Sequence, residues 1–182
     1  YAQTAAPDLS DPEVAHVAVT ANSIDIDLAR FAQPRTHNAE VRKFAGTMIT
    51  DHSAVNQQAA ALAGRLGVTP KDNAVSQSLL KGASEARAAI TTLQGHAFDQ
   101  GYIDREVAYH RAVLDALDGL LIPTTSNAEL KKLLVDVLEY AADEEHAVEL
   151  PWHPVGEIEI LTPGRWEPAE LGIRDRVSNL FW

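Results

Sequence analysis

One stretch of the chain places acidic and imidazole side chains at the spacing of a single helix face. Between residues 95 and 121, Asp99, Glu106 and His110 follow one another at intervals of seven and four residues. Positions three, four and seven apart share a helix face, so these side chains extend the apolar line that continues with Val113 and Leu117. A helix with such a line buries it, and buried ionisable groups need partners. The spacing therefore predicts a hydrogen-bonded polar network or a metal site.

Two residues on other helical segments join this set. His52 lies in the apolar stripe of residues 39–66, and Asp25 lies beside the stripe of residues 12–33. Imidazole nitrogen and carboxylate oxygen together suit iron, manganese or zinc. If these residues form a metal site, its candidate ligands are His52, His110, Asp99, Glu106 and Asp25. If they instead form a hydrogen-bonded polar network, the same buried residues give packing specificity and need no cofactor. Spacing alone leaves both alternatives open.

Known catalytic patterns are missing from the sequence. It contains no Gly-rich phosphate loop, no Ser-centred nucleophile elbow and no HExxH zinc helix. Asp51 and His52 are adjacent, so on a helix their side chains point about 100° apart and cannot form an orienting pair. We therefore expect a protein that is not an enzyme.

Composition excludes several classes of partner. The net charge of −11 argues against nucleic acid and against electrostatic attachment to an anionic membrane. No apolar run approaches the roughly 18 residues of a transmembrane helix. The absence of cysteine excludes disulfides and thiolate metal sites. The first residues, YAQTAAPDLSDP, are mostly small or polar, which is typical of the N-terminus that remains after a signal peptide is removed. This pattern predicts a periplasmic or outer-envelope protein.

Helix signals divide the first 150 residues into a bundle. Residues 1–11 are predicted to be a disordered lead-in, and Pro12 is expected at the first helical position. Asn38 is a candidate N-cap and Gly67 a C-terminal stop for the next helix. A short helix then leads into the 98–121 helix, which Pro123 is expected to end, and a last helix covers residues 128–150. The sequence predicts an all-α, up-and-down four-helix bundle with an extra short helix over residues 12–150.

Residues 151–182 differ in character from the bundle. They hold the three tryptophans and four prolines, and they lack an amphipathic helix long enough to fold alone. We expect an extended arm packed on its own bundle or on a protein partner. The candidate partner-binding residues are Trp152, Trp166, Leu180, Phe181 and Trp182.

Three segments together resemble a known family. ANSIDIDLARFA, EVRKFAGTMITDHSAVNQ and GHAFDQGYIDREVAYHRAVL resemble an exported bacterial helical-bundle domain of unknown function, often labelled "predicted outer membrane protein" and counted among the ferritin-like bundles. The resemblance covers about residues 12–138. It implies secretion, a four-helix core and an acidic residue at Asp25. It also implies a histidine in the last helix, where His146 is the counterpart. Helical spacing by itself leaves open whether His146 or Glu145 faces the core.

Two functions follow from these patterns. The first is a non-catalytic accessory subunit that docks through its C-terminal arm onto a larger envelope or membrane-associated assembly. The second is a ferritin-like metal binder with interhelical His and carboxylate ligands. The chain lacks the Glu-x-x-His pair of di-iron proteins, and Glu106-x-x-x-His110 and Asp143-x-x-His146 are its nearest forms. The sequence does not identify the partner, the metal or the oligomeric state.

Overall fold

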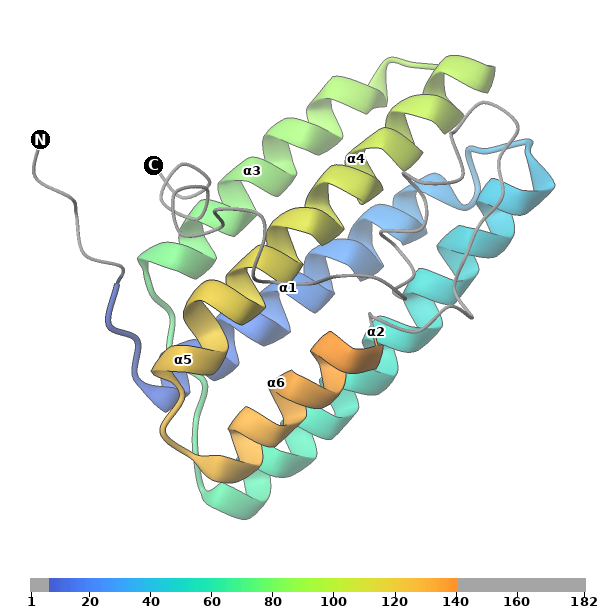
Figure 1. Cartoon of the computed structure of the whole chain (residues 1–182). Helices are drawn as coiled ribbons and strands as arrows, with labels where there is room; N and C mark the ends of the chain where they lie inside the picture. Colours follow the sequence, from blue (N-terminus) through green and yellow to red (C-terminus); the bar gives the residue numbers. More distant parts are fainter. Residues whose placement is uncertain (1–6, 141–182) are drawn as a thin grey trace, which may run out of the picture.

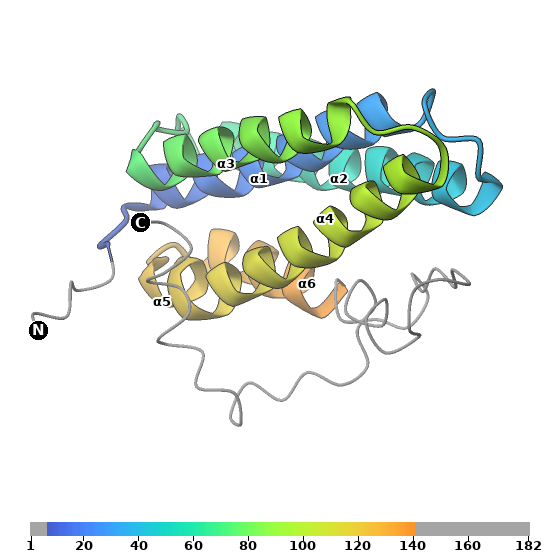
Figure 2. The same ribbon diagram turned by 90° about the horizontal axis from the view of Figure 1, so that it is seen from above.

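The computed structural model describes residues 7–140 of the 182-residue chain, and every regular element in that range is helical. Four long helices follow one another: α1 (Asp11–Ala32), α2 (Ala39–Leu66), α3 (Ala74–Thr91) and α4 (Gly95–Ala116). A π-helical turn η1 (Leu117–Leu121), the short α5 (Ile122–Thr124) and α6 (Ala128–Tyr140) complete the order. Helix α1 lies between α2 and α3, and α4 and α6 lie on another side of this layer (Figures 1 and 2). The chain therefore forms a helical bundle. No helix in residues 7–140 is long and apolar enough to cross a membrane.

Local sequence signals explain where the first two helices begin and end. Ser10 caps α1 in a capping box with Glu13, so the helix begins at Asp11 and Pro12 is its second residue. Leu9 is buried, so the last residues of the predicted 1–11 lead-in pack on the bundle. Asn38 Oδ1 accepts hydrogen bonds from two backbone amides at the start of α2.

The C-terminal stop of α2 is the predicted one. Gly67 adopts a left-handed conformation with φ of 62°, which a residue without Cβ reaches at little cost. The two α2 boundaries expected from the sequence are confirmed.

The end of α4 differs from the expectation that Pro123 stops the helix. The Ile122 amide donates to the Leu117 carbonyl, five residues back, so the backbone widens into a π turn before the proline. In a regular α-helix the proline ring would clash with the backbone carbonyl four residues earlier, and the wider turn moves that carbonyl away. Thr124 Oγ1 then donates to Leu120 O, and Thr125 Oγ1 to Leu121 O, which satisfies carbonyls near the proline. The helical path therefore continues to Thr124.

Two apolar cores occupy opposite ends of the bundle. One contains Phe44 and Met48 of α2 with Phe98 and Tyr102 of α4. The other surrounds the η1 turn; its buried members are Leu9, Val14, Val17, Leu62, Val75, Leu117, Leu120, Leu121, Leu130 and Leu134. Along α1, α2 and α4 the sequence between the two cores holds polar residues. The candidate site lies in this polar layer.

The predicted last helix and arm are only partly within the described residues. Helix α6 is described to Tyr140, so its predicted extension to residue 150, with Glu145 and His146, lies outside them. The predicted arm of residues 151–182, with its five candidate partner-binding residues, also lies outside the described part of the chain.

Candidate metal centre

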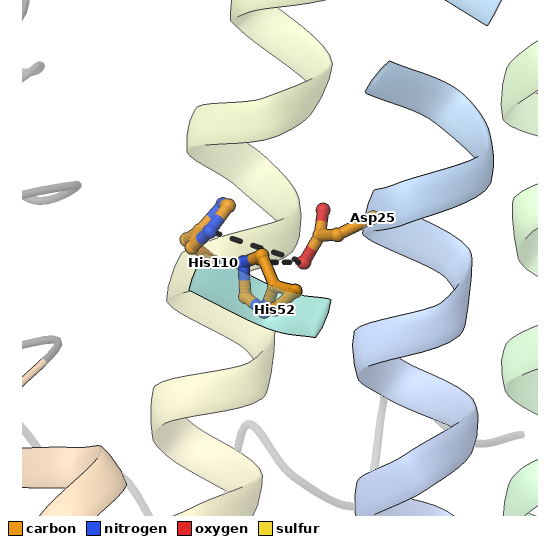
Figure 3. A group of neighbouring side chains, drawn as sticks. All are labelled: Asp25, His52 and His110. Atoms are coloured by element: carbon orange, nitrogen blue, oxygen red, sulfur yellow. Dashed lines mark ion pairs between the residues drawn. The ribbon is translucent and has the colours of Figure 1, made fainter. Parts of the chain in front are cut away.

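Three side chains from three helices converge in the polar layer. Asp25 comes from α1, His52 from α2 and His110 from α4 (Figure 3). One potential ligand atom of each lies within 4.8 Å of the others. Asp25 Oδ2 is 3.4 Å from His52 Nε2 and 3.9 Å from His110 Nε2. The two imidazole rings are 5.7 Å apart between centroids. Two imidazoles and one carboxylate oxygen thus surround a common point.

The hydrogen bonds of the outer ring nitrogens set the tautomers. His52 Nδ1 lies 2.7 Å from Asn22 Oδ1, and His110 Nδ1 lies 2.9 Å from the Glu106 carbonyl oxygen. Both of these oxygens are acceptors, so each Nδ1 carries the proton and donates it. In the neutral ring the other nitrogen, Nε2, then holds a lone pair. Both lone pairs face the same Asp25 oxygen, so three acceptors converge where a cation would satisfy them.

Burial sets the charges of this group. The Asp25 side chain is 3% exposed and that of His52 is 20% exposed. Burial, and next the neighbouring His110, lower the pKa of His52 from 6.5 to about 3. Burial also raises the pKa of Asp25 from 3.8 to about 6, although Glu106 and the Arg105 guanidinium offset part of the rise. At neutral pH the site therefore presents neutral His52 and a carboxylate, which are the forms that bind metals.

Glu106 is adjacent to this group but faces it from another side. Its side chain is fully buried, and Oε2 lies 3.7 Å from His110 Nδ1, the nitrogen that points away from Asp25. Burial, and next the negative charge of Asp25, raise the pKa of Glu106 well above its ordinary value. The carboxyl therefore keeps its proton, and neither of its oxygens has a hydrogen-bond partner within the described residues. A protonated Glu106 therefore adds no second negative charge beside Asp25.

Asp99 lies elsewhere in the bundle. It is buried on α4, and its Oδ1 makes no hydrogen bond within the described residues. It precedes His110 by eleven residues, which is about 16 Å along a helix axis at roughly 1.5 Å per residue. Of the five candidate ligands, the structure thus brings together Asp25, His52 and His110, places Glu106 beside them, and leaves Asp99 apart.

Several residues around the site were not among the sequence candidates. Asn22 orients His52, and Tyr109 donates a hydrogen bond to the Ala21 carbonyl at 3.1 Å. Arg105 stacks on Tyr109, with its Cζ 4.2 Å from the ring centroid, and its Nη1 lies 3.5 Å from Glu106 Oε1. Asn22 precedes Asp25 by three residues, so a search for polar pairs on one helix face could have found it. Nothing in the spacing distinguishes Arg105 from a solvated charge.

These features define a helical bundle with a partly buried His-His-Asp cluster between two apolar cores. The sequence profile of a family described as "Domain of unknown function (DUF4142)" matches residues 1–150. The chain therefore belongs to the DUF4142 family. No curated protein and no solved structure matches this chain significantly.

Proposed function

We propose that this protein binds a divalent transition-metal ion through Asp25, His52 and His110. The observation that carries the proposal is the convergence of both Nε2 lone pairs on one buried carboxylate oxygen. In a metal-ligating histidine, the N–H of the other ring nitrogen commonly donates a hydrogen bond to a carbonyl or carboxylate oxygen, which fixes the ring. Both histidines have such an acceptor here, one in an amide side chain and one in a backbone carbonyl.

The donor set narrows the choice of ion. Two imidazole nitrogens and one carboxylate oxygen suit zinc, iron(II) or manganese(II), whereas calcium and magnesium prefer oxygen ligands alone. Three protein ligands leave coordination positions for water or another ligand.

The remaining expectations from the sequence stay hypotheses. The ferritin-like topology is supported by the position of the cluster between helices of a bundle. Export to the periplasm rests on the character of the first residues and on the resemblance. The accessory-subunit function rests on residues 151–182, which lie outside the described residues.

Metal analysis of the full chain tests the proposal. Protein purified without chelator is expected to contain close to one equivalent of zinc, iron or manganese. After chelation, adding the ion at about 100 times its Kd should raise the free energy of unfolding by roughly 2.7 kcal/mol. His110→Gln should remove the bound metal, whereas His37→Gln, at an exposed position, is a matched control that should keep it. Substoichiometric metal together with an unchanged melting temperature would refute the proposal.

A further inference from the structure

An apolar groove of about 440 Å³ lies between α1, α2 and α6, and we call it the α1–α2–α6 groove. Helix α6 lies along the C-terminal part of α2 (Figures 1 and 2), where Arg65 Nη2 donates to Glu129 Oε2 at 3.1 Å. Many apolar side chains that line the groove are only partly buried; they include Ala18, Val55, Leu66, Leu133 and Val137. The apolar core around η1 is therefore still open to solvent along this groove.

Charged side chains are nearly absent from the groove. Asp11 is the one charged residue among the described residues that line it. Its two carboxylate oxygens accept hydrogen bonds from the backbone amides of Ser126 and Asn127, at 2.8 and 3.0 Å. The amide oxygen of Asn22, at another point of the lining, is paired with His52 Nδ1. We therefore expect an apolar and uncharged occupant, because no charged group here is left to meet a counter-charge.

Residues 151–182 are connected to the bundle beside this groove. Helix α6 is described to Tyr140, and Val137, about one turn earlier, lines the groove. The 13 residues of α6 span about 20 Å at roughly 1.5 Å per residue. A fully extended chain spans at most about 3.6 Å per residue, so the twelve residues from Tyr140 to Trp152 can span about 43 Å. Every part of the groove along α6 is therefore within reach of residues 151–182.

We propose that residues 151–182 bind to their own bundle, with a tryptophan side chain in the α1–α2–α6 groove. The three tryptophans of the chain, Trp152, Trp166 and Trp182, all belong to this segment. An apolar cavity of roughly 150 Å³ admits benzene. A groove of about 440 Å³ therefore has room for an indole ring and a neighbouring aliphatic side chain. Docking would remove both the ring and the apolar lining from water.

The covalent connection favours this segment over a second copy of the chain. A second copy would bring the same tryptophans, but only at the concentration of the protein in solution. A segment tethered by a short linker binds at an effective concentration in the millimolar range. Docking within one chain is also independent of protein concentration, whereas docking between copies increases with it. Dilution therefore distinguishes the two occupants.

Tryptophan fluorescence of the full-length protein in EDTA tests this inference. No residue outside 151–182 is a tryptophan, so the emission reports on this segment alone. The emission maximum should lie at shorter wavelength than in urea, and acrylamide should quench the emission less, because the ring is shielded from water. Dilution should leave both results unchanged. Both should also persist in His110→Gln, so failure of the metal proposal leaves this inference intact.

Variants of the full-length chain locate the ring. Three variants that each keep one tryptophan, with the other two changed to phenylalanine, identify which ring is shielded. Ala59→Phe fills the groove and should move the emission toward its value in urea. Ala83→Phe is the matched control, because Ala83 lines a different cavity of about 260 Å³ between α1, α3 and α4, and it should keep the wild-type emission. Far-ultraviolet circular dichroism verifies the fold of each variant.

The absence of cysteine permits a second test that leaves the groove unfilled. A nitroxide spin label attached to Ala60→Cys, an exposed position at the rim of the groove, should quench the tryptophan emission, since nitroxides quench fluorophores on close approach. The same label attached to Ala88→Cys, an exposed position on α3, should leave the emission unquenched.

Several outcomes would overturn the inference. An emission maximum equal to that in urea would show that all three tryptophans are in water. Equal effects of Ala59→Phe and Ala83→Phe, or equal quenching by the two spin labels, would place the rings away from the groove. A shift to shorter wavelength that disappears on dilution would assign the groove to a second copy of the chain.

Discussion

Asp25→Asn offers the sharpest test of how the polar layer is charged. The substitution keeps the shape of the side chain and removes its negative charge and its titration. In the metal-free protein, burial raises the pKa of Asp25 from 3.8 to about 6. The difference between about 6 and 3.8 is about 2.2 pH units, which at roughly 1.36 kcal/mol each gives about 3 kcal/mol. Ionised Asp25 therefore destabilises the metal-free fold by about that amount relative to the protonated form.

The sign of the pH dependence follows from which state binds the proton. Between pH 3.8 and about 6 the folded protein holds a proton on Asp25 that the unfolded chain has released. The stability due to this proton is fully present below pH 3.8 and is lost as pH rises through about 6. The amide introduced by Asp25→Asn cannot titrate. Wild type should therefore lose up to about 3 kcal/mol relative to Asp25→Asn as pH rises from about 4 to 7.5.

Urea unfolding of both proteins in EDTA, at several pH values in this range, measures the difference. Any constant offset between the two proteins reflects the contacts of the introduced amide, so only the change with pH counts. A difference that stays constant with pH would show that Asp25 is solvated. A wild type that gains stability relative to the variant as pH rises would show an ionised Asp25 paired with a charged histidine. Either result refutes the description of Asp25 as a buried carboxylate beside neutral imidazoles, on which the metal proposal rests.

Two further variants test separate features of the bundle. His52→Gln should remove a group whose folded pKa lies at about 3, below its ordinary 6.5, so wild type should lose stability relative to the variant as pH falls from about 6.5. Urea unfolding of chelated protein at pH 7 and pH 5 measures this, and an identical pH response would mean that His52 titrates normally. Asn38→Ala removes an acceptor of the Glu40 and Val41 amides and should cost about 1 kcal/mol of unfolding free energy. Thermal melts at pH 7 measure that cost, and an unchanged melting temperature would show that water caps α2 equally well.

The helices were predictable because their end signals are local. Asn38 and Gly67 bound α2 through the hydrogen-bonding and conformational preferences of single residues, which tertiary structure did not override. Pro123 was misleading because its effect is not local: it depends on the π turn that precedes it. Whether a helix stops or widens at a proline depends on packing around the η1 turn, and no single residue specifies that packing.

The site was predictable only in part, because helical spacing gives the face of a residue but not its neighbours on other helices. His52 and His110 lie on inward lines and meet in the bundle. Asp99 shares the line of His110 on α4, yet lies three turns away along the helix. Asp25 was expected beside its stripe and is almost fully buried, because α1 lies between α2 and α3 and has little face left for solvent.

The charges in the polar layer are more consistent with ligand binding than with a purely structural network. In a network that serves stability, each acceptor meets a donor. Here both Nε2 lone pairs face an Asp25 oxygen that is also an acceptor, while the buried Nε and Nη1 donors of Arg105 remain unused. The excess of acceptors around Asp25 calls for a cation. If wild type loses stability relative to Asp25→Asn as pH rises, then folding alone does not explain a carboxylate at this position, and metal binding does.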